Sequence, residues 1–264
     1  MSLDLLWDPL FRAALLTGLV LAVVLPLLGA YLHLRREWLA TLGLSHVAAA
    51  GGVLAPVLGW PVIVTAFVVT ALAAAAKSLV MRPGNDRYVI LMLAGWAFAI
   101  LAAGISHQGE LLAQSLMRGQ LYFVSMTHVW MALGLLALAA VLLPWLSPRL
   151  QLERFFPDHF SANRISPWPH RGGFELLVVS GVVLGIVVMG VMAAFALIFV
   201  PAWVAFRLAR GWRQALALCV GFGVFSYVLA YGLAIVFDQP FGPVLVAVLL
   251  VLALLRLWPR RVNA

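Results

Sequence analysis

The residues best suited to chemistry are two ionisable side chains in otherwise apolar surroundings. His46 lies inside the charge-free window 38–76, where an imidazole can bind a metal ion or carry a proton. It can equally be a neutral histidine that hydrogen-bonds a neighbouring helix. Asp238 is the only acidic residue after Glu175. Because it directly precedes Gln239-Pro240, it is either a pathway carboxylate or a simple turn residue.

A second group of polar residues lies between 106 and 128. His107, Glu110 and His128 could together attract a cation, because imidazole and carboxylate groups are common ligands of divalent metals. Solvated loop residues would have the same composition, and this second interpretation is the simpler one.

The sequence lacks the motifs of enzymes that use such residues. Its only lysine, Lys77, follows four alanines, so no Gly-x-x-x-x-Gly-Lys-[Ser/Thr] phosphate loop exists. The chain cannot hydrolyse ATP by that route, and it has no His-Glu-x-x-His zinc motif. Ser45 and His46 are adjacent, but adjacent residues of a helix face about 100° apart and do not form a nucleophile–base pair. We expect no enzymatic activity.

The elements that must position these residues are membrane-spanning helices. Hydrophobic residues make up 65% of the 264 residues and charged residues only 10%, against about 25% in soluble domains. The charge-free windows suit helices of about 20 residues and accommodate eight or nine of them. The sequence therefore predicts an all-α, polytopic transmembrane bundle in a single domain, 1–264. The windows are 13–34, 38–76, 88–109, 119–148, 176–206, 214–237 and 239–255.

Basic clusters determine the predicted topology, because Lys and Arg concentrate in cytoplasmic loops. All clusters can be cytoplasmic only if an even number of spans joins each to the next. The N-terminus is then outside, the C-terminus is cytoplasmic, and the net charge of +8 needs no nucleic acid as partner. The basic clusters lie at 35–36, 77–87, 149–171, 207–213 and 256–261. The predicted outer turns are Gly59-Trp60-Pro61, a loop in 106–126, and Asp238-Gln239-Pro240.

Two segments need separate treatment. Between Arg171 and Arg207 the chain is short for two crossings, so we expect a full helix over 174–192 and a short or broken returning helix over 195–208. One long tilted helix is the alternative. The other segment is a polar cytoplasmic loop over 147–172, whose prolines forbid one continuous helix. The lone Cys219 excludes a disulfide within the chain.

Three passages resemble the membrane permease subunit of bacterial zinc/manganese ABC importers. Leu44-Ser-His-Val-Ala-Ala-Ala-Gly-Gly is similar to the family's histidine-bearing second helix. Residues 194–210, in which an apolar run reaches Pro201 and then a basic turn, resemble the family's short helix. Asp238-Gln-Pro-Phe-Gly-Pro resembles its Asp-x-Pro-x-Gly-Pro outer turn. The likeness covers most of residues 10–256 and fades in 147–172.

The resemblance implies a homodimeric importer in the bacterial cytoplasmic (inner) membrane. A cytoplasmic ATP-binding subunit would supply the energy, and an extracytoplasmic solute-binding protein would deliver a divalent metal ion. This chain would bind no cofactor of its own. His46 would be the metal ligand and, with Asp238, part of the transport pathway. A coupling segment over 207–214 would contact the ATPase through Arg207, Arg210, Gly211 and Arg213.

Three positions depart from the family's pattern. An acid four residues before the histidine is Leu42 here, a frequent histidine of the fourth helix corresponds to Gly95, and a Gly-Asp pair reads Gly119-Gln120. Since a divalent cation prefers several carboxylate or imidazole ligands, the cargo stays open between a free ion and a chelated metal or uncharged solute. In a different class, a proton-coupled secondary transporter using His46 and Asp238 is the alternative.

Overall fold

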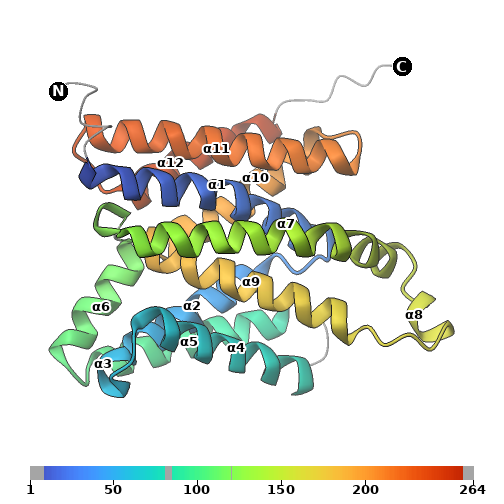
Figure 1. Ribbon diagram of the computed structural model, residues 1–264, viewed down its shortest axis with the longest axis horizontal. Helices are drawn as coiled ribbons and strands as arrows, with labels where there is room; N and C mark the ends of the chain where they lie inside the picture. Colours follow the sequence, from blue (N-terminus) through green and yellow to red (C-terminus); the bar gives the residue numbers. More distant parts are fainter. Residues whose placement is uncertain (1–8, 81–84, 120, 258–264) are drawn as a thin grey trace.

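The computed structural model describes residues 9–80, 85–119 and 121–257, and these ranges are helical throughout apart from turns. The long helices lie side by side in stacked layers (Figure 1). The α-helices are α1 (Pro9–Leu34), α2 (Leu39–Val53), α3 (Ala55–Leu58), α4 (Val62–Val80), α5 (Asp86–Ala103), α6 (His107–Arg118), α7 (Met126–Phe155), α8 (His159–Ala162), α9 (Trp168–Met189), α10 (Val191–Leu208), α11 (Trp212–Val236) and α12 (Phe241–Ala253).

Six of the described helices, α1, α5, α7, α9, α10 and α11, are long and apolar enough to cross a membrane. Shorter apolar helices at α2, α4 and α12 occupy the positions of the remaining predicted spans. The predicted polytopic membrane bundle is therefore confirmed. The predicted loop over 106–126 contains an amphipathic helix, α6, whose first turn is capped by Ser106: its hydroxyl accepts from the Gly109 N–H at 3.0 Å.

Gly190 separates α9 from α10 and has a positive φ of 86°, which glycine adopts without steric cost. The start of α9 and the end of α10 both contact the end of α1. Arg35 lies over the Phe174 ring at 5.4 Å, and His33 lies beside Phe206 at 4.5 Å between ring centroids. The two helices therefore run in opposite directions, as two crossings require, and one long tilted helix is excluded.

The returning helix is longer than the sequence suggested. α10 begins at Val191 rather than near 195, spans 18 residues and contains Pro201 without ending there. Proline removes one backbone hydrogen bond, but Pro201 is buried and neighbouring helices hold α10 in place. Gly29 of α1 allows that contact, because a Cβ there would lie 1.9 Å from the Ile198 carbonyl oxygen. The shortest of the apolar helices are instead α2, with 15 residues, and α12, with 13.

The predicted cytoplasmic loop over 147–172 is mostly helical. α7 continues through Pro144 and Pro148 to Phe155, and α9 already begins at Trp168. Residues 156–167, with the short α8, are the connection that remains between them. The prolines thus prevent one continuous helix, as expected, but Pro148 does not end α7.

Helix contacts divide the described chain into two parts. The first, the α2–α6 unit (residues 39–118), packs mainly within itself: α2 contacts α5, α4 and α6. The second, the main bundle, consists of α1, α7 and α9–α12. The parts meet where α9 contacts α4 and α2, and where α10 contacts α2. Figure 1 shows α2–α5 below α9, with α1, α7 and α11 above it.

Candidate transport pathway

The predicted cytoplasmic basic clusters gather at one end of the bundle, which we call the basic end. Arg35, Lys77, Arg87 and Arg171 line one cavity, and Arg213 lines a neighbouring groove together with the last turns of α7. The opposite end carries α6, the turn at Gly59 and the turn at Asp238. The basic clusters and the predicted turns therefore lie at opposite ends of the helices, as the positions of the charges in the sequence predicted.

His46 lies on α2, seven residues or about 10 Å beyond the start of that helix. Its side chain is half-buried, and Nδ1 lies 2.9 Å from the Leu42 carbonyl oxygen one turn earlier. The imidazole is therefore held against its own helix. Within the described ranges, no group of three or more His, Cys, Asp and Glu side chains is placed to hold a metal ion. His46 alone does not form a metal site.

Gly95 of α5 lies directly against the backbone of His46. A Cβ at Gly95 would be 2.5 Å from the Val47 nitrogen and 2.6 Å from the His46 carbonyl carbon. Gly43 makes a similar approach, since its Cβ would lie 2.5 Å from the Tyr88 carbonyl oxygen. Small residues allow helices in a membrane to pack in backbone contact. This packing leaves no room for a second ligand at position 95.

Asp238 lies in the exposed turn between α11 and α12 and has a φ of 50°, a conformation that aspartate tolerates better than most residues. The next backbone N–H, that of Gln239, donates to the Ala234 carbonyl at 2.9 Å. In the described part of the chain, no hydrogen bond or ion pair joins Asp238 to His46. The two candidate pathway residues are separate, and Asp238 has the geometry of a turn residue.

The other polar candidates of the sequence serve helix ends. His107 and Glu110 lie on the exposed face of α6, with 3.9 Å between Nδ1 and Oε2. His128 caps α7: its Nδ1 accepts from the Ser125 N–H at 3.3 Å, in a reciprocal arrangement with the Ser125 hydroxyl. They do not converge on a common cation site.

Three glycines from distant parts of the sequence meet at the opposite end. Gly119 follows α6, Gly190 joins α9 to α10, and Gly242 belongs to the Asp-x-Pro-x-Gly-Pro turn. A Cβ at Gly119 would lie 2.2 Å from the Met189 carbonyl oxygen, and one at Gly242 would lie 2.8 Å from the Arg118 carbonyl oxygen. We call Gly119, Gly190 and Gly242 the glycine junction. It joins the end of the α2–α6 unit to the main bundle through backbone contact.

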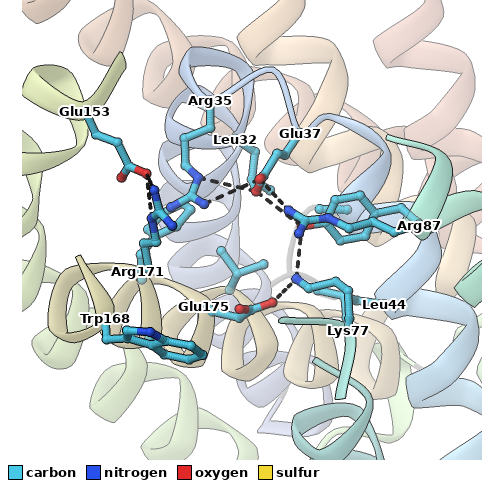
Figure 2. Close-up of a pocket in the computed structure, with 15 residues that line it drawn as sticks. Leu32, Arg35, Glu37, Leu44, Lys77, Arg87, Glu153, Trp168, Arg171 and Glu175 are labelled. Carbon is cyan, nitrogen blue, oxygen red and sulfur yellow. Dashed lines mark hydrogen bonds and ion pairs between the residues drawn. The ribbon is translucent and has the colours of Figure 1, made fainter. Parts of the chain in front are cut away.

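A charged cavity that the sequence did not predict lies at the basic end (Figure 2). Its volume is about 230 Å³, and it extends from the exposed Trp168 to the buried Leu44 and Val178. Helices α1, α2, α4, α5, α7 and α9 contribute to its walls. Its charged residues are Arg35, Glu37, Lys77, Arg87, Glu153, Arg171 and Glu175.

Two ion pairs in this cavity join the α2–α6 unit to α9 and to the link between α1 and α2. Lys77 of α4 pairs with Glu175 of α9, and its Nζ donates to the Tyr88 hydroxyl at 3.1 Å. Arg87 of α5 pairs with Glu37, with 2.6 Å between Nη2 and Oε1. The Lys77 and Arg87 side chains are only 3% and 9% exposed, so losing either partner would leave a buried charge. We call Glu37, Lys77, Arg87 and Glu175 the ion-pair layer.

Glu37 is fixed from the main-bundle side of the cavity. Its backbone N–H donates to the Leu32 carbonyl at 3.0 Å, and Arg35 Nε lies 3.3 Å from its carboxylate. Burial alone would raise the pKa of this carboxyl, but the positive charges of Arg35 and Arg87 outweigh burial. The pKa of Glu37 therefore lies below its ordinary value of 4.5.

A third acid, Glu153 of α7, forms its pairs within the main bundle. Arg171 lies 2.6 Å from Oε1, and His170 Nε2 lies 3.2 Å from Oε2. One feature of the sequence could have predicted this charged cavity: Glu37, Glu153 and Glu175 all lie within or beside the basic clusters. Acids in such positions are natural partners for the surrounding arginines and lysine.

The predicted coupling segment forms the turn between α10 and α11. α10 ends at Leu208, and the Arg210 N–H donates to Gln214 Oε1 at 2.8 Å across the turn. Arg207 lies in the last turn of α10, where a positive charge interacts favourably with the helix dipole. The exposed residues of the turn are Leu208, Arg210, Gly211, Arg213 and Gln214.

Trp212 anchors this turn to the main bundle. Its indole Nε1 donates to the Ser147 hydroxyl at 3.4 Å, and its ring meets Tyr31 edge-on with 5.0 Å between centroids. A groove of about 1220 Å³ lies beside it, between the last turns of α7 and the start of α11. The turn is therefore fixed at its base and accessible at its tip.

The chain matches the family described as the ABC 3 transport family over residues 8–260. The manganese transport system membrane protein MntC of Halalkalibacterium halodurans is 27% identical over 241 residues, which cover 89% of this chain and 81% of that protein. The chelated iron transport system membrane protein YfeD of Yersinia pestis is 24% identical over 244 residues, which cover 91% of this chain and 82% of that protein.

A solved structure has the same fold. PsaBC from Streptococcus pneumoniae in complex with Fab superposes with a TM-score of 0.84 at 21% sequence identity. The superposition covers 97% of this chain and 94% of the other. The shared fold therefore extends over nearly the whole chain.

Proposed function

The chain belongs to the ABC 3 transport family, and from this premise we propose that it imports a divalent metal ion of the zinc or manganese type into the bacterial cytoplasm. As a family member it is the multi-pass membrane permease subunit of a metal-ion ABC transporter and is not itself catalytic. Its partners are an ATP-binding subunit and an extracytoplasmic binding protein. The match over residues 8–260 carries this proposal, and the name of the relative MntC supports manganese as one candidate cargo.

The proposed orientation follows from the charges. With the basic end in the cytoplasm, the positive-inside rule is satisfied by every cluster, the N-terminus lies outside and the C-terminus lies inside. α6 and the turn at Asp238 then lie on the outer side, where the binding protein delivers the ion. We propose Asp238 as a residue near the entrance of the pathway.

The turn between α10 and α11 is the proposed contact with the ATPase. Its tip is exposed and basic, and Trp212 ties its base to α1 and α7. A movement imposed on the turn would therefore pass to the main bundle. Arg207, Arg210, Gly211 and Arg213 form the proposed coupling residues.

We propose that two copies of the chain enclose the pathway and that His46 contacts the ion as it passes. The half-buried position of His46 supports this role, because a second copy could complete its surroundings. Leu42 and Gly95 add no ligand near it within one copy. We therefore expect His46 to bind the ion weakly and transiently, which suits a pathway better than a storage site.

A chelated metal or an uncharged solute is the second candidate cargo. The contact of Gly95 with the His46 backbone supports it, because this packing excludes a second imidazole. The relative YfeD is named as a chelated-iron transport protein. A proton-coupled secondary transporter has no comparable support, since His46 and Asp238 are joined by no hydrogen bond or ion pair in the described ranges.

The test is ATP hydrolysis by the reconstituted complex. The chain is co-purified with its ATP-binding subunit, placed in liposomes, and supplied with the binding protein loaded with Zn²⁺ or Mn²⁺. We expect metal-loaded binding protein to stimulate hydrolysis, and His46→Ala to raise the metal concentration needed for half-maximal stimulation by about tenfold. His107→Ala, which removes an 83% exposed imidazole from α6, is the matched control.

Each outcome distinguishes the candidates. Stimulation by chelated metal but not by the free ions would assign the second cargo. Equal stimulation of wild type and His46→Ala would remove His46 from the pathway. Failure to co-purify with any ATP-binding subunit, including after crosslinking, would contradict the proposed coupling turn.

A further inference from the structure

We propose that the ion-pair layer is a latch that closes the cytoplasmic side of the permease. When the latch opens, the α2–α6 unit and the main bundle separate at that end and pivot about the glycine junction. The inference rests on the proposed orientation and transport role, and it assigns gating functions to Lys77 and Glu175.

The placement of the ion pairs supports a latch. Lys77–Glu175 joins α4 to α9, and Arg87–Glu37 joins α5 to the segment that follows α1. Lys77–Glu175 therefore connects the two parts of the chain directly, and Arg87–Glu37 ties the α2–α6 unit to the link that follows α1, whereas Glu153–Arg171 connects two helices of the main bundle. Figure 2 shows the connecting pairs side by side across the cavity.

The cavity allows water to solvate the charges of the ion-pair layer when they separate. Glu175 is 26% exposed, and the cavity runs from the surface at Trp168 past both pairs. Water entering from the rim can therefore solvate each charge once its partner moves away. A dry apolar contact at the same place could separate only by exposing apolar surface, which has no such compensation.

The opposite end of the same boundary is suited to pivoting. The glycine junction holds the end of α6 against the turn between α9 and α10 by backbone contact, without charges of its own. Gly119 and Gly190 both have positive φ values, 85° and 86°, and glycine can change φ and ψ with little steric penalty. Hinge positions are residues that absorb such changes.

The deep end of the cavity reaches α2, the helix that carries His46. Leu44 lines this end on the face of α2 that lies about 200° around the helix from His46. Leu44 is 1% exposed in this arrangement, so the cavity does not admit solvent beyond it. Separation of α4 and α5 from α9 would uncover the Leu44 face of α2 to the cytoplasm.

The proposal is tested by the accessibility of position 44. Cys219 is the only cysteine, so Cys219→Ala with Leu44→Cys gives a full-length chain with one reporter thiol. Inside-out membrane vesicles containing this chain are treated with an uncharged, membrane-impermeant maleimide. We expect Lys77→Gln/Glu175→Gln, which leaves the net charge of the cavity unchanged, to raise the labelling rate by about tenfold.

Two further variants separate a latch from a general loss of packing. The exchange Lys77→Glu/Glu175→Lys restores an ion pair and should return labelling to near the parent rate. Arg171→Gln breaks an ion pair in the same cavity but within the main bundle, and should leave the rate near that of the parent. All variants are compared after confirmation of equal thermal unfolding midpoints in detergent, and Glu37→Gln/Arg87→Gln provides the same test if the first double variant is unstable.

The proposal is overturned if the neutral double variant labels at the parent rate, if the exchanged pair labels as fast as the neutral one, or if Arg171→Gln has an equal effect. Labelling requires no cargo, so it reports on the latch even if the proposed metal cargo is wrong. Conversely, metal-stimulated ATP hydrolysis with unchanged labelling would support the cargo and reject the latch.

Discussion

The two ends of the boundary between the α2–α6 unit and the main bundle are joined in opposite ways. At the glycine junction, Gly119, Gly190 and Gly242 bring backbones so close that no methyl group fits between them. At the basic end, long charged side chains reach across a cavity of about 230 Å³. Added volume should therefore disrupt the glycine junction, and lost charge should disrupt the basic end.

This difference explains how a chain with few charges can hold its parts together and still move. Backbone contact fixes distance but leaves rotation at glycine open, whereas an ion pair can break and re-form when water enters. In a membrane, neither end can rely on the hydrophobic effect between helices, because lipid is as apolar as the helix surface.

The largest effect is expected when volume is added to the glycine junction. In Gly190→Ala the new Cβ would lie 2.6 Å from the Gly119 nitrogen, at a φ of 86° that alanine rarely adopts. We expect a loss of about 3–5 kcal/mol in the free energy of unfolding, from strain and overpacking together. The measurement is denaturant or SDS unfolding in detergent micelles.

Gly134→Ala is the control for this change, because a Cβ at Gly134 in α7 meets nothing within 4 Å. There, alanine should be neutral or should stabilise by up to about 1 kcal/mol, since it favours the helix. Equal effects of the two substitutions would show that the glycine junction is not a close contact.

A smaller effect is expected when one charge of the ion-pair layer is removed. Glu175→Gln leaves Lys77, whose side chain is 3% exposed, without its ion-pair partner. We expect a loss of about 2–3 kcal/mol, below that of a fully buried pair because Glu175 is 26% exposed. Lys77→Met in the same chain should recover most of it, and no recovery would mean that the charge of Lys77 is not the cause.

The sequence predicted the helices and their order well, because the length of an apolar window and the position of a basic cluster depend only on neighbouring residues. Windows between charges correspond to α1, α2, α4, α5, α7 and α9–α12, and the turns at Gly59 and Asp238 lie where expected. The predicted start of α10, near 195, was four residues too late, because the short distance between Arg171 and Arg207 was taken to require a short returning helix. In the structure a single residue, Gly190, separates α9 from α10, so both helices fit into this segment, and α10 continues through Pro201.

The site was much less predictable, because it depends on contacts between distant residues. Lys77 and Glu175 are 98 positions apart, and Glu37 and Arg87 are 50 apart. In the sequence, each basic residue predicted only that its loop is cytoplasmic, and it did not identify the acid with which it pairs. Gly95 indicated a missing ligand, but only the structure gives the physical reason: the backbone of His46 occupies the space.

Acid should weaken the basic end and not the glycine junction. The pKa of Glu37 lies below its ordinary value of 4.5, so the unfolded chain binds more protons than the folded one in this range. Stability from this group is therefore present above pH 4.5 and is lost as the pH falls through the lowered pKa. The unfolding midpoints of wild type and Glu37→Gln should converge as the pH is lowered from about 6 to about 3, and parallel curves would contradict the assignment.

The smallest effect is expected for a basic side chain that lies outside the ion-pair layer. Arg149 on α7 donates to the Trp145 carbonyl at 2.7 Å and lies 4.2 Å above the Trp145 ring, and among the described residues both contacts stay within α7. We expect Arg149→Gln to change the free energy of unfolding by about 0.5 kcal/mol or less, because water can solvate this charge in either state. The free energies of unfolding of wild type and Arg149→Gln are compared by the same unfolding measurement as for Glu175→Gln. A loss as large as that of Glu175→Gln would mean that positive charge anywhere at the basic end is stabilising, and the distinction between paired, enclosed charges and the rest of the basic end would fail.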